Sequence, residues 1–254
     1  MRYFLEIAYD GTRFHGWQVQ PNAISVQEVL DDSLSKILRE TINSTGSGRT
    51  DTGVHASQQL VHFDCSQHLD PQQVVYRLNR ILPDDISAYN LYLVPDDAHA
   101  RYDAFARTYH YHVTLRKDPF KRYYAWYHSK PLDVEKMNEA AAILLKYEDF
   151  TTFSKVKGDT KHYRCNMYEA FWQQHGYELI FTIRANRFLR GMVRLIVGAL
   201  ADVGRGKLTI AQFEQMIASQ DRSQASGAAP SEGLYLARVE YPENLFQKIT
   251  QIKL

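Results

Sequence analysis

The spacing of apolar residues constrains the fold most, because it changes between the period of a strand and that of a helix along the first hundred residues. Residues 3–9 alternate apolar with other side chains, which predicts a strand. Residues 26–38 have apolar positions three and four apart after a Ser25–Glu28 capping box, which predicts a helix. The other elements predicted here are strands at 59–64 and 86–94 and a helix starting at the Asp70-Pro71 cap.

The order β-α-β-α-β is typical of a ferredoxin-like half, in which helices cover one side of a sheet. The rest of the chain forms a weak repeat of this order, since it also begins with a Tyr-rich strand and carries helices between strands. We therefore predict an α+β protein with domains at 1–105 and 106–254. The elements predicted in the second domain are strands at 108–115, 163–172 and 178–185, helices after Asp133, from Met192 and after Thr209, and a last strand after Leu236.

Composition indicates an ordinary soluble globular protein, with 254 residues, 44% hydrophobic and 23% charged. No apolar run approaches the roughly 20 residues of a membrane helix, and no signal-peptide pattern is present at the start. Two cysteines, Cys65 and Cys165, are too few for a disulfide framework, so we expect free thiols and a cytoplasmic protein.

Net charge is only +1, but basic residues are concentrated in two segments. Residues 184–207 contain six basic residues against one acid, and residues 101–130 contain seven against two, interleaved with tyrosines. Cations neutralise phosphates and aromatic rings stack on bases, so these segments suit RNA. The alternative is a solvated surface whose compensating acids lie nearby in space, and charge alone does not decide between the two.

The loop at 45–56 combines three glycines and four hydroxyl residues with Arg49, Asp51 and His55. Polar loops between regular elements are where sites usually lie, although a turn satisfied by its own side chains is the simpler interpretation. A phosphate-binding P-loop is excluded because Asn43 stands where its first glycine is required. A dinucleotide fingerprint is excluded because Asp51 stands where its last glycine is required.

The ordered string Gly-Arg-Thr-Asp-Thr-Gly-Val-His-Ala at 48–56 closely resembles the signature of the TruA family of tRNA pseudouridine synthases. Other blocks resemble the same family in the same order, so the resemblance covers nearly the whole chain. They are Tyr9–Thr12 with Gly16-Trp17-Gln18-x-Gln20, Asn79 with Leu82–Ile86, Ala100–Tyr111, Met192–Gly198 and Ala229–Leu236.

The resemblance implies an isomerase that converts uridine to pseudouridine in the anticodon stem-loop of tRNA, at positions 38–40. It also implies two ferredoxin-like halves related by a pseudo-two-fold axis, a central RNA-binding cleft, a homodimer, and neither cofactor nor metal. The site residues it implies are catalytic Asp51, Tyr109 and Arg194, and substrate-binding Arg49, Tyr109, Gln18 and His55. Thr52 and Gln58 depart from the family, which more often has Ala and Gly there.

The reaction breaks an N-glycosidic bond, rotates the base and forms a C–C bond, with no redox step. Asp51 is expected to act as nucleophile or as base, and the sequence leaves both open. By the same resemblance, Arg194 pairs with this carboxylate, and Tyr109 stacks on the flipped base and helps to remove the C5 proton. Arg49 is a candidate for phosphate contact.

Two other functional classes remain open at this stage. An RNA-binding module without catalysis is one, and a glycosidase using Asp51 is the other, although a glycosidase usually needs a second carboxylate. His110 and His112 share a strand face, but without further ligand spacing we interpret them as surface histidines rather than as metal ligands. The basic loop at 155–162 is either an RNA contact or a solvated loop.

Overall fold

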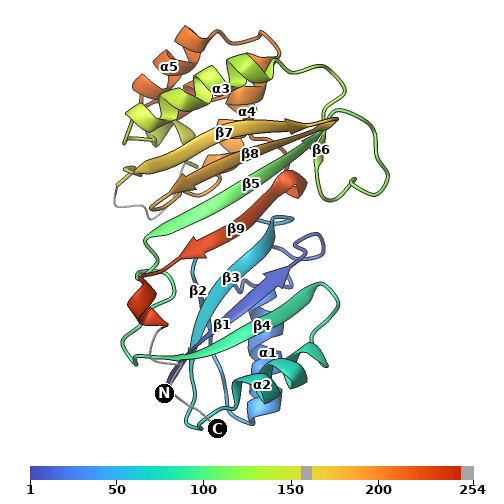
Figure 1. Ribbon diagram of the computed structural model, residues 1–254, viewed down its shortest axis with the longest axis vertical. Coiled ribbons are helices and arrows are strands. Elements are labelled where there is room, and N and C mark those ends of the chain that lie inside the picture. Colours follow the sequence, from blue (N-terminus) through green and yellow to red (C-terminus); the bar gives the residue numbers. More distant parts are fainter. Residues whose placement is uncertain (156–161, 247–254) are drawn as a thin grey trace. The chain divides into compact units, whose positions relative to one another are not determined.

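The computed structural model describes residues 1–155 and 162–246, which form two compact units (Figure 1). Among the described residues, unit 1 comprises Met1–Phe105 and Leu236–Phe246, and unit 2 comprises Ala106–Tyr235. The chain therefore returns to the first unit at Leu236. Both units are α+β and mostly antiparallel, which confirms the α+β class predicted from the sequence.

The sheet of unit 1 is built around its first strand, which lies between two antiparallel partners, so that Phe4 pairs with His62 on one side and with Tyr92 on the other. Two helices cover one face of this sheet (Figure 1). The strand order is β4 (Ile86–Val94), β1 (Arg2–Tyr9), β3 (His55–Asp64), β9 (Leu234–Glu240), with β2 (Thr45–Gly46) beside β3. The helices are α1 (Val26–Leu38) and α2 (Pro71–Asn79).

Both helices of unit 1 begin where their caps predict. The Ser25 hydroxyl accepts a hydrogen bond from the Glu28 backbone N at 3.2 Å, and the Asp70 carboxylate accepts from the first turn of α2. Strand β3 begins at His55 rather than at Gln59, and the two-residue β2 was not predicted. The loop that carries Asp51 therefore runs directly into a strand.

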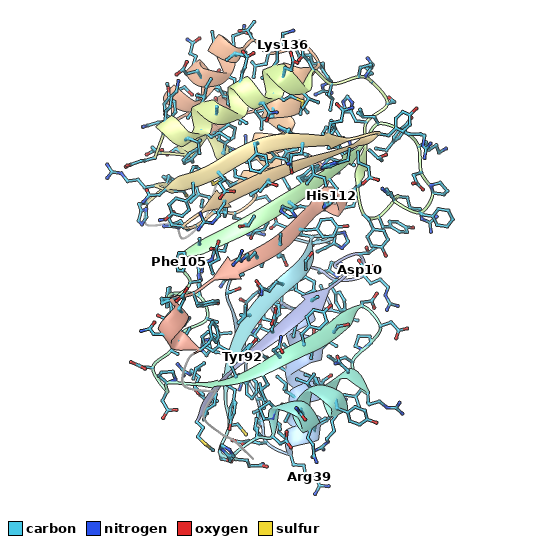
Figure 2. All side chains as sticks on the ribbon, viewed as in Figure 1. Asp10, Arg39, Tyr92, Phe105, His112 and Lys136 are labelled. Carbon is cyan, nitrogen blue, oxygen red and sulfur yellow. The ribbon has the colours of Figure 1, made fainter. Side chains whose placement is uncertain are left out.

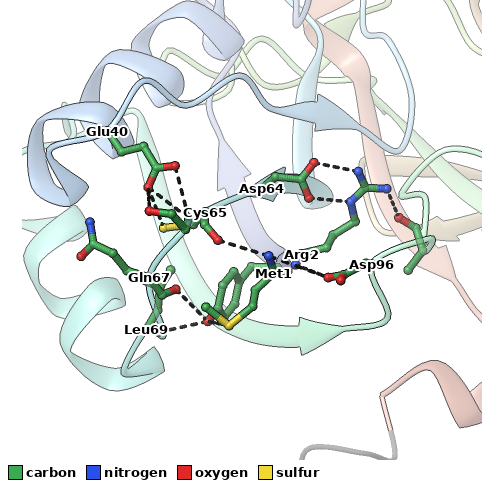
Figure 3. Close-up of polar contacts among 11 residues, drawn as sticks. Met1, Arg2, Glu40, Asp64, Cys65, Gln67, Leu69 and Asp96 are labelled. Carbon is green, nitrogen blue, oxygen red and sulfur yellow. Dashed lines mark hydrogen bonds and ion pairs between the residues drawn. The ribbon is translucent and has the colours of Figure 1, made fainter.

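A polar network joins the start of β1 to the ends of β3 and α1 (Figure 3). Arg2 donates to both carboxylate oxygens of Asp64, at 2.9 and 2.8 Å, and to the Ala98 carbonyl at 3.0 Å. The Arg2 hydrogen bond lowers the pKa of Asp64. Glu40, just after α1, accepts from the Ser66 hydroxyl at 2.8 Å. This network lies at the end of β1 and β3 opposite the loop that carries Asp51.

The sheet of unit 2 has the order β5–β8–β7, and the short β6 pairs with β5 in parallel, so the sheet is mixed. Its helices lie on one side of β7 and β8 (Figure 1). The strands are β5 (Ala106–Thr114), β6 (Trp126–Tyr127), β7 (Met167–His175) and β8 (Glu178–Ala185). The helices are α3 (Val134–Ile143), α4 (Met192–Gly204) and α5 (Ile210–Ala218).

Asp133 caps α3 as predicted, and Thr209 with Gln212 forms the predicted capping box of α5. Strand β7 begins at Met167, four residues later than predicted from position 163, because the preceding residues bond elsewhere. The Tyr163 carbonyl accepts from Phe150 N, and Cys165 N donates to the Glu148 carbonyl. These bonds replace the ladder partners that the alternating pattern had suggested.

Short 3-10 helices complete the described chain. They are η1 (Leu144–Lys146), η2 (Thr151–Phe153), η3 (Arg222–Gln224), η4 (Ser231–Gly233) and η5 (Glu243–Leu245). Both cysteines are free and buried, as expected. Across 1–155 and 162–246, no helix has the length and apolar character needed to span a membrane.

Candidate active site

The backbone on both sides of Asp51 is held by the N-terminal segment of unit 1. We call residues 47–54 the Asp51 loop. Thr50 is buried, its hydroxyl lies 2.9 Å from the Tyr9 hydroxyl, and its carbonyl accepts from Trp17 N at 3.2 Å. On the other side, Gly53 N donates to the Phe14 carbonyl at 3.3 Å. The loop is therefore fixed immediately before and after its half-buried aspartate.

A tight turn shapes the chain at Asp51 itself. Val54 N donates to the Asp51 carbonyl at 3.1 Å, and Gly53 has a φ of +74°, which a side chain would strain. The predicted turn is therefore present in the backbone, whereas the Thr50 hydroxyl contacts Tyr9 rather than the backbone of the turn.

Two glycines outside the loop allow the N-terminal segment to approach it. A Cβ on Gly16 would lie 2.4 Å from the Thr50 carbonyl oxygen, and Gly16 also has a φ of +85°. A Cβ on Gly11 would lie 2.0 Å from the Val54 carbonyl oxygen. Any side chain at either position would displace the Asp51 loop, because both contacts are with backbone atoms.

A buried glutamine on β3 holds the start of the loop. Gln59 is fully buried; its Oε1 accepts from the Ser47 hydroxyl at 2.9 Å and its Nε2 donates to the Gly48 carbonyl at 2.9 Å. Ser47 N also donates to the Leu60 carbonyl at 2.8 Å. Because all these groups are satisfied inside the protein, the bonds fix the geometry of the loop firmly.

The other predicted residues of unit 1 occupy different environments. Arg49 is exposed beside the half-buried Asp51, as a phosphate-contacting residue requires. His55 is 2% exposed, and its Nδ1 lies 3.1 Å from both the Gly11 backbone N and the Asp10 carboxylate, at the end of β1 (Figure 2). This geometry suits a positioning role better than direct contact with a substrate.

Gln18 and the two departures from the family pattern are accommodated without disturbing the loop. Gln18 is exposed and donates to Gln27 Oε1 at 2.9 Å. Thr52 is exposed. Gln58 donates to Glu6 at 2.8 Å and accepts from Val239 N at 2.9 Å, and it lines a pocket of about 430 Å³ in unit 1. Gln58 thus connects β3 to β1 and β9.

Unit 2 contains the predicted aromatic residue on its first strand. Tyr109 is half-buried on β5, opposite Ile183 of β8, and the Phe188 ring lies edge-on to it at a centroid distance of 5.0 Å. Its neighbour Tyr111 is fully buried and donates to the Pro230 carbonyl at 2.8 Å. Burial raises the pKa of Tyr111 well above its ordinary value. Tyr111 is therefore a core residue, whereas Tyr109 remains partly accessible.

Arg194 has a fixed orientation on α4. Its Nε donates to the Ala229 carbonyl at 2.7 Å, and Ala229 N donates back to the Arg194 carbonyl at 2.9 Å. The segment before Ala229 passes against the helix at Gly198, where a Cβ would lie 1.9 Å from the Gly227 carbonyl oxygen. The close approach brings the Ala229 carbonyl to the guanidinium.

His110 and His112, which we interpreted from the sequence as surface histidines, are both half-buried. Their ring centroids lie 6.4 Å apart. The His112 ring lies edge-on to Tyr235 at 4.8 Å, and burial lowers the pKa of His110. Within the described part of the chain, no group of three or more His, Cys, Asp or Glu residues is placed to hold a metal ion.

The basic segment at 184–207 is partly compensated. Arg184 lies 3.7 Å from Glu169, and Arg205 pairs with Asp202 three residues before it. These two cations therefore fit the alternative of a balanced surface. Of the basic loop at 155–162, residues 156–161 lie outside the described residues.

Several residues that shape the site were not predicted from the sequence. Tyr9 contacts the loop and Ala229 contacts Arg194 from positions remote in the chain, whereas Gln59 contacts the loop from the strand that follows it. Of these residues, only Gln59 could have been recognised from the sequence, because it is a polar residue at an inward position of a strand. The Ala229 carbonyl could not have been recognised, since every residue has a backbone carbonyl.

Comparison with known proteins identifies the family. A family model described as tRNA pseudouridine synthase matches residues 7–103 and 140–242. The protein named tRNA pseudouridine synthase A of Bacteroides fragilis is 51% identical over 248 residues, covering 97% of this chain and 98% of that protein. Its namesake from Bacteroides thetaiotaomicron is 52% identical over 98% of this chain and 94% of that protein. The namesake from Porphyromonas gingivalis is 49% identical over 96% of this chain and 99% of that protein. The chain therefore belongs to the TruA family of tRNA pseudouridine synthases.

Proposed function

We propose that this protein isomerises uridine to pseudouridine in the anticodon stem-loop of tRNA, at positions 38–40, with Asp51 as the catalytic carboxylate. Its close full-length relatives are named tRNA pseudouridine synthase A, so it is an isomerase of that class. The observation that supports the role of Asp51 is its loop, which buried hydrogen bonds from Tyr9 and Gln59 hold in place. Preorganisation of this kind is what a reacting group requires.

In the proposed reaction the bond between C1′ and N1 breaks, the base rotates, and a bond forms between C1′ and C5. The proton leaves C5 and N1 regains one, so atoms balance without an external reactant. Asp51 acts on the substrate as nucleophile or base, and Arg194 stabilises its negative charge. Tyr109 stacks on the flipped base and assists removal of the C5 proton. Arg49 contacts phosphate, with Gln18 near the substrate and His55 supporting the turn.

The larger assembly is proposed from the family resemblance. The resemblance implies two ferredoxin-like halves related by a pseudo-two-fold axis, a central RNA-binding cleft and a homodimer. Helices on one face of each sheet support the ferredoxin-like interpretation. Two free, buried thiols fit a cytoplasmic protein.

Two rival functions are less well supported. An RNA-binding module without catalysis has no need of Asp51, Tyr109 and Arg194 together. A glycosidase needs a second carboxylate across the scissile bond and would release free base, whereas an isomerase leaves the RNA chain intact.

The test is tritium release from C5 of uridine-labelled tRNA transcripts. Wild type should release tritium, while Asp51→Asn should release none and still bind tRNA. Thr52→Ala is the matched control, because this exposed neighbour changes without touching the carboxylate, and it should stay active.

Residual turnover by a clean Asp51→Asn preparation would refute the catalytic assignment. Binding by the wild type without release from any tRNA would favour the binding module, and liberation of free uracil would favour the glycosidase.

A further inference from the structure

The loop that joins β5 to α3 in unit 2 has no part in the proposed chemistry, yet it carries many exposed rings and cations. We call residues 115–130 the β5–α3 loop. Figure 1 shows it extending beyond the ends of β5 and β8, and it includes the short β6. The segment is the later part of the basic stretch at 101–130, which is interleaved with tyrosines, and the proposed catalysis gives it no role.

The loop is anchored to the body of unit 2 at several points. Leu115 N donates to the Tyr177 carbonyl at 2.8 Å, and Lys121 forms an ion pair with Glu178. Further along, the Tyr235 hydroxyl donates to the Tyr124 carbonyl at 3.0 Å. Strand β6 then returns the chain to β5. A loop held in this way presents its side chains in a fixed arrangement, which lowers the entropy cost of binding.

The outward side chains of this loop include large aromatic rings. Phe120 is 86% exposed, which is unusual for an apolar ring of this size. Tyr123, Tyr124, Tyr127 and the neighbouring Tyr177 are also exposed. Apolar side chains gathered on one surface typically mark an interaction site.

Cations are interleaved with these rings. Residues 115–130 contain five basic residues and one acid, Asp118, which caps the turn at Phe120 N. The Arg122 guanidinium lies over the Tyr123 ring at 4.4 Å, and that of Arg116 lies over Tyr177 at 5.0 Å. A guanidinium that lies over a ring is held in place while its N–H groups can still bind a phosphate.

This combination suits RNA better than a protein partner. Exposed cations neutralise phosphates, and exposed rings stack on unpaired bases in a sequence-tolerant way. Protein interfaces instead are depleted of lysine, and this loop carries Lys117 and Lys130 exposed. Pairing the same surface of two copies would bring like charges together, which is unfavourable.

We propose that the β5–α3 loop is a second tRNA-contact surface, on which Arg116, Lys117 and Arg122 bind phosphates and the rings of Phe120 and Tyr123 stack on an unpaired base. The inference rests on the proposed function in taking tRNA as the ligand. It requires no role of the loop in the chemical step.

The experiment compares two double variants with a matched control by measuring the dissociation constant for an unmodified tRNA transcript at several salt concentrations. Phe120→Ala with Tyr123→Ala should weaken binding about tenfold, as expected for loss of one stacked base. Lys117→Gln with Arg122→Gln should make the slope of log K against log salt shallower by about 1.5, as expected for two lost phosphate contacts. Single-turnover rates at saturating tRNA should stay at the wild-type value in both.

The control is Tyr76→Ala with Arg80→Gln, which removes an exposed ring and an exposed cation from the end of α2 and should leave binding unchanged. Unchanged tRNA affinity in both loop variants would overturn the proposal. So would sedimentation showing that the loop variants lose self-association at unchanged tRNA affinity, because the surface would then be an interface between copies. If the wild type binds tRNA without forming pseudouridine and the loop variants still bind more weakly, the proposed function fails and this inference stands.

Discussion

At the scale of the residue, the Tyr9 hydroxyl helps to hold the backbone next to Asp51. Its contact with the Thr50 hydroxyl is buried, and Thr50 immediately precedes Asp51. Tyr9→Phe keeps the ring and removes the hydroxyl that makes this contact. A bond of about 1.4 kcal/mol used for positioning predicts a roughly tenfold slower single-turnover rate with unchanged tRNA affinity.

Tyr3→Phe is the matched control, because Tyr3 is another buried tyrosine of β1 with a hydrogen-bonded hydroxyl. That hydroxyl accepts from Leu69 N at 3.0 Å, at the edge of unit 1 shown in Figure 3. Its loss should lower the unfolding free energy by about 1–2 kcal/mol and leave the rate unchanged. Equal rates in Tyr9→Phe and Tyr3→Phe would show that the Tyr9 bond is structural only.

At the scale of the element, α4 and the segment before Ala229 depend on a glycine in the helix. Gly198→Ala should gain about 1 kcal/mol of helix propensity, yet its Cβ would lie 1.9 Å from the Gly227 carbonyl oxygen. The segment must then move, so we expect a net loss of roughly 1–3 kcal/mol in thermal unfolding and a lower rate, because Arg194 loses the Ala229 carbonyl. Gly227→Ala meets nothing within 4 Å and should behave as wild type. A Gly198→Ala protein as stable and active as Gly227→Ala would contradict this account.

At the scale of the whole molecule, the pH dependence of stability contains two opposed contributions. Burial raises the pKa of Asp31, on α1, from 3.8 to about 6, although Ser44 N donates to it at 3.0 Å. The stability that Asp31 contributes is fully present below pH 3.8 and is lost as the pH rises through about 6. Burial, with His99 nearby, lowers the pKa of His62 from 6.5 to about 4, so the contribution of His62 is present above pH 6.5 and is lost as pH falls toward 4.

Asp31→Asn isolates the first contribution, because asparagine keeps an acceptor for Ser44 N and cannot ionise. We expect its unfolding free energy to exceed that of wild type by roughly 1–3 kcal/mol above pH 6 and to match it below pH 4. Denaturant unfolding across this range measures the difference. If the unfolding free energy of Asp31→Asn exceeds that of wild type by the same amount at every pH, the Asp31 carboxyl is not the titrating group.

The sequence by itself determined the local features of this protein. Helix starts at Ser25, Asp70, Asp133 and Thr209 appear as predicted, because a cap depends on atoms within a few residues. Strand patterns likewise follow from alternation, and the family follows from ordered strings of residues. Only the tertiary structure decided which groups hold the site. Tyr9 contacts Thr50 across 41 residues, and Arg194 contacts Ala229 across 35. Before Met167, the backbone bonds to Glu148 and Phe150 instead of extending the strand. Such contacts arise from packing of the whole chain, and no local sequence pattern predicts them.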